Sequence, residues 1–307
     1  MKCEFVTCKV LLPPITPQEL ERILPTICDK ETAYDSKKWT PANPLYSHCT
    51  AVSLVAQNLF GGKLLCASLK DEPKFKHMKS HYWNELPDGT RTDFTKPQFR
   101  DDYPVALKPK VKRREDVLRF LSVARRYKLL ALRLAKTLNN NNPIFDDPIY
   151  RACFETALES DCQKMKFGCV VTHDSKVVYQ GSNKTIEALK SLCEGECIRF
   201  KIQSRTDQML GSCGHAEEFA LWEVAKKKIP LDESDLYIAG MYPNGMPWLK
   251  KTPQHTCLRC SIQMHNSGIR KIYVPVIDKW VGITSEEALQ TALAYATKEK
   301  SVETKAN

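Results

Sequence analysis

The C-terminal half of this chain is dominated by the run Gly214-His215-Ala216-Glu217-Glu218, which Cys257 and Cys260 complete further along. His215, Cys257 and Cys260 make a three-ligand zinc set. A catalytic zinc needs that number because its fourth tetrahedral position must stay open for water. Two cysteines at this spacing place both sulfurs on one helix face, and a helix N-terminus favours the thiolates that bind metal. Glu217 can reach the water on zinc without ligating the metal, so we predict that it is the catalytic proton shuttle.

A His-x-Glu run with a later Cys-x-x-Cys resembles the zinc-dependent cytidine and deoxycytidylate deaminase superfamily. The resemblance covers about residues 148–297 and includes the typical run from Ser267 to Tyr273. It departs at Thr256, where the family usually has proline. It implies an α/β fold in which a three-layer α/β/α sandwich carries zinc as its cofactor. A structural zinc site is the alternative, but it would require a fourth protein ligand and would leave Glu217 unexplained.

The same resemblance implies substrate-binding residues. Asn183 matches an asparagine at the end of the second strand that contacts the sugar or base, although a turn-forming asparagine is the alternative. Phe167 and Gly168 lie where the first strand of the family lines the base pocket, and Ala216 is also assigned to substrate binding. Trp248, in the long loop before Cys257, could stack on a base or pack on its own loop.

The whole chain has 307 residues, enough for two domains that each bury a core. Charged residues make up 27% and hydrophobic residues 42%, an ordinary globular balance. No apolar run approaches the length of a membrane span, and no apolar signal-peptide core follows Met1. We therefore read the thirteen cysteines as reduced thiols and metal ligands of a cytoplasmic protein. The net charge of +10 suggests anionic partners such as nucleotides or nucleic acid.

The N-terminal residues 1–107 predict a smaller α+β domain. Its hairpin, about residues 81–95, turns at Pro87-Asp88-Gly89. Three loop residues with glycine in the left-handed position fit a type I turn followed by a bulge. That loop length places His81 and Asp93 on the same face of the sheet, whereas a two-residue loop would separate them.

A thiol site is one interpretation of this domain. The order Cys49, His81, Asp93 is similar to that of papain-like and transglutaminase-like folds, in which a helix start acidifies the thiol and aspartate orients the histidine. About residues 40–103 also resemble a bacterial family of unknown function, the YunG-like one. The alternative is a buried cysteine, a core histidine and a turn-supporting aspartate, and the sequence identifies no oxyanion donor.

A basic helical connector, residues 108–147, is predicted between this domain and the deaminase-like domain, residues 148–307. We expect one long helix from about Val111 to Leu138, ended by the Asn139–Pro143 run. Its many lysines and arginines could follow a phosphate backbone or form a solvated helix face.

Three further thiols, those of Cys193, Cys197 and Cys213, lie in an insert before His215. Together with a histidine they could hold a second zinc, as in some deoxycytidylate-type deaminases, although no clean four-ligand spacing is present.

The function indicated is zinc-dependent hydrolytic deamination of a cytosine-type base, nucleoside or nucleotide in nucleotide metabolism. One alternative is a deaminase of bases in tRNA or single-stranded DNA, which would use the basic connector. Another is a binding module that keeps zinc as a scaffold and has lost catalysis. A homo-oligomer is also among the expectations, because neighbours in this family often complete one another's pockets.

Overall fold

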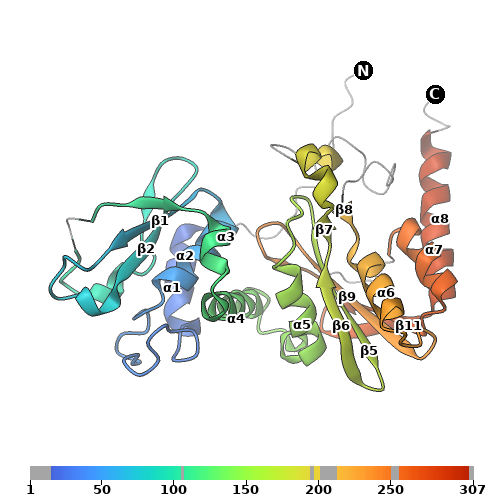
Figure 1. Ribbon diagram of the computed structural model, residues 1–307, viewed down its shortest axis with the longest axis horizontal. Helices are drawn as coiled ribbons and strands as arrows, with labels where there is room; N and C mark the ends of the chain where they lie inside the picture. Colours follow the sequence, from blue (N-terminus) through green and yellow to red (C-terminus); the bar gives the residue numbers. More distant parts are fainter. Residues whose placement is uncertain (1–14, 105–106, 194–196, 201–212, 250–255, 304–307) are drawn as a thin grey trace. The chain divides into compact units, whose positions relative to one another are not determined.

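The computed structural model describes residues 15–104, 107–193, 197–200, 213–249 and 256–303 (Figure 1). The chain divides into two compact units, residues 1–130 and 131–307. Both mix helices with sheets, so the predicted α/β class is confirmed. Within the described ranges, no helix is both long enough and apolar enough to cross a bilayer.

The N-terminal unit contains a four-stranded antiparallel sheet in the order β3-β2-β1-β4. Helices α1 and α2 precede it in the chain, and α2 packs against β2. The elements are α1 (Pro17–Ile27), α2 (Cys49–Phe60), β1 (Lys63–Ser68), β2 (Ser80–Glu85), β3 (Arg91–Thr92) and β4 (Lys110–Lys112).

The hairpin between β2 and β3 has the predicted three-residue loop. Leu86 and Thr90 close it, with the Leu86 N–H donating to the Thr90 carbonyl at 2.8 Å. Gly89 adopts the left-handed conformation, with φ of 87°. In the strands, Asn84 lies opposite Thr92, and continuing this register brings residues 83 and 93 opposite each other.

The single helix expected from Val111 to Leu138 is not present. Lys110–Lys112 pair with β1 as an edge strand, and two helices follow, α3 (Arg114–Leu118) and α4 (Leu121–Leu138). The sheet edge supplies hydrogen-bond partners that the sequence pattern does not reveal. Arg114 then ties α3 to α2, because its guanidinium donates to the Leu54 carbonyl at 2.9 Å.

The C-terminal unit is built on a sheet in the order β12-β11-β9-β5-β6, in which β11 runs parallel to β9 and the other pairs are antiparallel. The two-residue strand β10 also pairs with β9, and β7 pairs with β8. The strands are β5 (Lys166–His173), β6 (Lys176–Ser182), β7 (Lys184–Thr185), β8 (Cys213–Gly214), β9 (Ser234–Met241), β10 (Pro247–Trp248), β11 (Lys271–Val276) and β12 (Lys279–Ile283).

Helices cover both faces of this sheet, which gives the predicted three layers. Figure 1 shows α5 (Pro148–Ala157) on one side, and α6 (Ala216–Lys226), α7 (Leu258–Ser267) and α8 (Ser285–Glu303) on the other. Successive residues of β5 face opposite sides of the sheet and so contribute to two different cores. Gly168 faces the backbone of α5, whereas Cys169 and Val171 pack with the buried residues of α6 and α7.

Strand β12 was not expected from the sequence. Its hairpin with β11 turns at Ile277, whose φ is 47°, a conformation that is rare for a β-branched residue. Asn142 supports this turn by donating to the Ile277 carbonyl at 2.6 Å. A contact so distant in sequence leaves no local turn signal. The remaining short elements are 3₁₀ helices: η1 (Lys76–Met78), η2 (Lys96–Phe99), η3 (Pro143–Asp146), η4 (Glu187–Cys193) and η5 (Ile198–Phe200).

Candidate functional sites

His215, Cys257 and Cys260 converge in the C-terminal unit. Their ligand atoms all lie within 4.8 Å of one another. The Nδ1 atom of His215 is 3.2 Å from the Cys260 sulfur and 3.3 Å from the Cys257 sulfur. Among the described residues, this is the one group of three or more histidine, cysteine or acidic side chains placed so that it could hold a metal ion.

Two helix starts bring these side chains together. His215 is the N-cap of α6 and Cys257 is the N-cap of α7, with Cys260 in the first turn of α7. The Cys257 sulfur accepts the backbone N–H of Cys260 at 3.4 Å. Because the partial positive charge of a helix is concentrated at its N-terminus, both helices stabilise negative sulfur at this point.

The electrostatics of the cluster agree with its geometry. Hydrogen bonding to Cys260 and to His215 lowers the pKa of Cys257 to about 4. The pKa of Cys260 is raised by its hydrogen bond to Cys257 and by burial. The first thiol to ionise therefore makes the second harder to ionise. Zinc takes deprotonated sulfur and neutral imidazole as ligands. Two sulfurs and one imidazole nitrogen are a donor set that fits this metal.

Glu217 lies in the first turn of α6, next to the cluster in sequence and 6% exposed. Burial raises the pKa of this carboxyl to about 7, and the nearby His215 limits the rise. A carboxyl group with a pKa near neutrality can both accept and donate a proton at physiological pH.

Glu218 joins the two helices. Its carboxylate accepts two hydrogen bonds from Arg259 on α7, each 2.5 Å long, and a third from Gln263 at 2.9 Å. It also accepts the backbone N–H of His215 at 2.9 Å. Glu218 thus fixes the start of α6 against α7, and with it the histidine against the two cysteines.

Comparison with known families matches both halves of the chain. Residues 144–276 match the cytidine and deoxycytidylate deaminase zinc-binding region, and residues 16–139 match the YunG protein. The C-terminal part carries a deaminase zinc-binding domain. The N-terminal part carries a YunG domain. Both resemblances recognised in the sequence are confirmed.

Two fungal proteins are similar to the deaminase domain. The deoxycytidylate deaminase of Schizosaccharomyces pombe is 28% identical over 145 residues, which cover 46% of this chain and 40% of that protein. The deoxycytidylate deaminase of Saccharomyces cerevisiae is 26% identical over 130 residues, which cover 42% of this chain and 37% of that protein. The matched region thus spans less than half the length of either relative.

Thr256 stands where deaminases usually have proline, and the structure shows the contact that this threonine makes. Its hydroxyl lies 2.7 Å from the hydroxyl of Ser261, and both side chains are buried. The two residues occupy the positions just before the N-cap and in the second turn of α7, where a hydrophobic staple often fixes the entering chain. A hydroxyl pair serves here in its place.

Asn183 is held by the deaminase domain itself. Its Oδ1 accepts from the Phe167 N–H at 2.7 Å and from the Ser160 hydroxyl at 2.8 Å, while its Nδ2 donates to the Met165 carbonyl at 2.9 Å. The side chain therefore ties the end of β6 to the start of β5. One amide hydrogen is left, and any contact with substrate would have to use it.

Two aromatic rings lie near the end of the central strand β9, close to where α6 and α7 begin. Phe167 and Trp248 lie opposite Gly240 from either side of β9, and their rings meet edge to face at 5.8 Å. A Cβ at Gly168 would meet the backbone of α5, so this glycine permits close packing of the helix on the sheet, and its place in a base pocket stays a prediction. Ala216 is fully buried in the core between sheet and helices.

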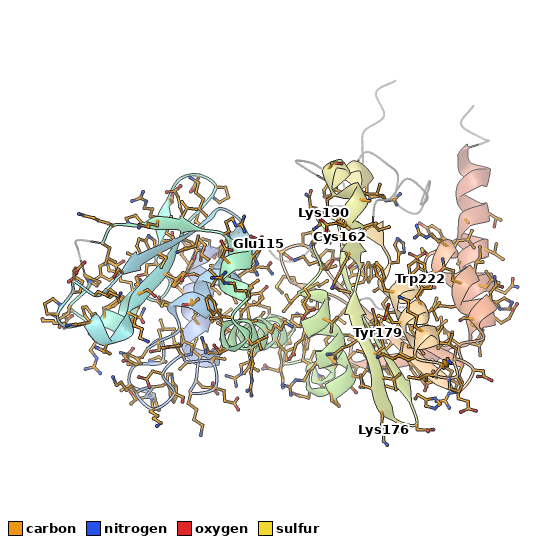
Figure 2. The ribbon with its side chains drawn as sticks, viewed as in Figure 1. Glu115, Cys162, Lys176, Tyr179, Lys190 and Trp222 are labelled. Atoms are coloured by element: carbon orange, nitrogen blue, oxygen red, sulfur yellow. The ribbon has the colours of Figure 1, made fainter. Side chains whose placement is uncertain are left out.

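The extra cysteines form a partial group. Cys162, labelled in Figure 2, hydrogen-bonds Cys213, and this bond lowers the pKa of Cys162 to about 6. Cys197 is buried, and the side chain of Cys193 lies outside what the structure describes. Cys162 is not among the residues predicted from the sequence, because it follows α5, away from the insert. Among the described residues these extra thiols form no group of three metal ligands, and a second zinc at the insert stays an alternative to the single site.

In the YunG domain the structure brings Cys49, His81 and Asp93 together. The His81 Nε2 is 2.7 Å from Asp93 Oδ2. Cys49 is the first residue of α2, and its thiol lies close enough to His81 for the two side chains to shift each other's pKa. Gln98, which the sequence analysis did not identify, places its amide nitrogen 3.5 Å from the other ring nitrogen of His81.

Proposed function

We propose that the C-terminal unit is a zinc-dependent hydrolytic deaminase of a cytosine-type base presented as a deoxycytidylate-class nucleotide. The observation that carries the proposal is the convergence of His215, Cys257 and Cys260 on two helix starts, with buried Glu217 beside them. The deaminase domain and the names of the two yeast relatives support a pyrimidine nucleotide as the substrate.

His215, Cys257 and Cys260 would hold the metal, and three protein ligands would leave it open to a water molecule. Zinc bound there supplies Lewis-acid activation, which brings the pKa of a water molecule close to neutrality. Glu218 and Arg259 keep the ligands in register by fixing α6 against α7.

Glu217 performs the proton transfers. It accepts a proton from the attacking water, whose oxygen bonds to the ring carbon that carries the amine. It delivers this proton to the ring nitrogen and then transfers the second proton of the water, from the hydroxyl now on the ring carbon, to the amine. The carbon–nitrogen bond breaks, and ammonia and a uracil-type base are released. Burial among apolar residues raises the pKa of Glu217, so the same carboxyl can act first as base and then as acid.

Phe167 and Trp248 would hold the base. Their rings lie on the sheet face that α6 and α7 cover, at the strand ends where both helices begin. Stacking on aromatic rings orients a base without depending on its sugar or phosphate. Asn183 fixes the strand that carries Phe167 and has one amide hydrogen left for substrate.

The basic segment between residues 108 and 147 gives less support to a polynucleotide substrate. Arg114 is occupied by the Leu54 carbonyl, Arg113 pairs with Asp116, and Lys136 pairs with Asp146. Positive charges engaged in this way are less available for a continuous phosphate track. A free nucleotide is therefore the substrate we propose.

A substrate panel tests the proposal. The whole chain is incubated with deoxycytidylate, cytidylate, deoxycytidine, cytosine and a cytosine-containing single-stranded oligonucleotide, and ammonia and the uracil product are measured. We expect the fastest turnover with deoxycytidylate. Turnover confined to the oligonucleotide would favour the nucleic-acid deaminase, and zinc-loaded protein inactive on every substrate would favour the binding module.

A further inference from the structure

The YunG domain contains a cluster of chemically competent side chains that the deaminase reaction does not use. Cys49 and Gln98 approach His81, and Asp93 binds the other side of its ring. We infer that this cluster is a second catalytic site, which hydrolyses a carboxylic ester or amide through a thioester on Cys49. Its residues all lie in the N-terminal unit, and its chemistry requires no metal.

His81 is fixed in one orientation. Its Nε2 bonds to Asp93, and the other carboxylate oxygen accepts from the N–H and the hydroxyl of Thr95, each at 2.9 Å. The histidine ring is fully buried, stacks on Trp83 at 5.5 Å and meets Phe99 edge to face at 4.8 Å. Since Asp93 takes Nε2, Nδ1 is the nitrogen left to exchange a proton with the thiol.

Cys49 sits where a nucleophile can be activated. It is the first residue of α2, and α2 packs against β2, the strand that carries His81 (Figure 1). Burial alone would raise the pKa of Cys49, but the hydrogen bond and charge of His81 lower it below its usual value. In turn, Asp93 and Cys49 raise the pKa of His81 to about 9 against the effect of burial. The pair therefore favours thiolate and imidazolium.

Other charged and titratable groups lie around the thiol and do not oppose this. Arg126 interacts favourably with a negative Cys49, and a backbone hydrogen bond from Tyr82 also lowers the pKa of Cys49. The Cys66 thiol on β1 has its pKa raised, chiefly by burial. Cys66 thus serves as an internal reference. It is a buried cysteine on the sheet that carries His81, and no histidine is among the causes of its pKa shift.

Gln98 supplies the oxyanion donor that the sequence did not reveal. Its Nε2 is 3.5 Å from His81 Nδ1, the nitrogen assigned to the thiol. The residue is buried, its Oε1 accepts from the Ser47 N–H at 3.3 Å, and its carbonyl accepts from Asn43 at 3.0 Å. With the amide oxygen held, the amide nitrogen faces His81 Nδ1, and it is the donor that we assign to the oxyanion. The first-turn N–H groups of α2 add donors that lack intrahelical acceptors.

The reaction balances with water as the only co-reactant. The Cys49 sulfur bonds to the carbonyl carbon, the carbon–nitrogen or carbon–oxygen bond breaks, and His81 gives its proton to the leaving amine or alcohol. Water then attacks the thioester while His81 takes its proton. The carbon–sulfur bond breaks, the carboxylic acid leaves, and the proton on His81 restores imidazolium beside the Cys49 thiolate.

The test uses the whole chain and a small acyl donor, p-nitrophenyl acetate, because the Cys49 side chain is only 7% exposed. Peptide mass spectrometry should find an acetyl group on Cys49 during turnover. Iodoacetamide near pH 6.5 should label Cys49 at least about tenfold faster than Cys66, because the thiolate is the reactive form. This comparison within the wild-type protein needs no variant. Equal labelling of the two cysteines, or acetylation elsewhere only, overturns the proposal.

Variants separate a catalytic cluster from a merely structural one. His81→Gln should slow alkylation of Cys49 toward that of an ordinary thiol, with Cys66→Ser as a control that leaves it unchanged. Gln98→Ala should keep rapid alkylation but slow acyl transfer by about 10²–10³-fold, the usual effect of losing an oxyanion donor. Folded His81→Gln protein with unchanged Cys49 reactivity would contradict the role of the histidine. Equal loss of alkylation and acyl transfer in Gln98→Ala would show that Gln98 only supports packing.

Discussion

Glu217 is the residue on which the proposed chemistry depends most. It is buried in the first turn of α6 but is not one of the three clustered ligands. Glu217→Gln should keep the metal and the fold and lower the turnover number by about two to four orders of magnitude, because positioned proton transfer is lost. Glu223→Gln, on the exposed side of the same helix, is the matched control. Near-normal turnover of a zinc-loaded Glu217→Gln protein would show that another group moves the proton.

Thr256 offers a second test at the scale of single side chains. Thr256→Val removes one partner of the buried hydroxyl pair and leaves Ser261 unpaired, which should cost about 1–3 kcal/mol in the free energy of unfolding. Removing both hydroxyls, in Thr256→Val with Ser261→Ala, should cost less than the sum of the single changes. Urea denaturation, with hydrogen exchange in α7 as the probe, measures the loss of unfolding free energy in each variant. Strict additivity would mean that the two hydroxyls do not stabilise each other.

At the scale of elements, the site depends on two helices starting side by side. Glu218 on α6 and Arg259 on α7 make this contact with two parallel hydrogen bonds. We predict that Glu218→Gln weakens zinc binding by about 10–100-fold, as loss of a supporting residue around a metal site often does. Competition with a chromophoric chelator measures the affinity. An unchanged affinity would show that α6 and α7 hold their places without this pair.

Element by element, the sequence predicts what is encoded locally. His215 and the Cys257/Cys260 pair stand at helix starts that their own spacing reveals, and the hairpin loop that ends at Gly89 fixed the common face of His81 and Asp93. Gln98 and Cys162 escaped prediction because they lie in a 3₁₀ turn and after a helix end, where no periodic pattern marks them. Tertiary contacts alone place them beside their partners.

The strands that the sequence failed to predict share a cause with these residues. Strand β4 forms because β1 has an open edge, and β12 forms because Asn142 supports a left-handed Ile277. In both cases a long-range partner satisfies the backbone. Gly168 shows the effect of position along a strand, since one residue decides whether a side chain would face α5 or, as Cys169 does, the layer of α6 and α7.

At the scale of the whole molecule, the chain combines two compact units with different chemistry. The deaminase domain offers a soft three-ligand set and a buried carboxyl, whereas the YunG domain offers a thiol, an imidazole and an amide. The net charge of +10 is that of the whole chain, and it favours anionic ligands. A negatively charged nucleotide fits both this charge and the relatives of the deaminase domain.

In the proposed function His215, Cys257 and Cys260 hold a catalytic zinc, and metal analysis of the purified chain tests this assignment. Inductively coupled plasma mass spectrometry should find about one tightly bound zinc per chain in the wild type, as a single three-ligand site requires. The Cys66→Ser control should bind the same amount, and Cys260→Ser should lose the metal together with deamination. Zinc content that is unchanged in folded Cys260→Ser protein would contradict the account.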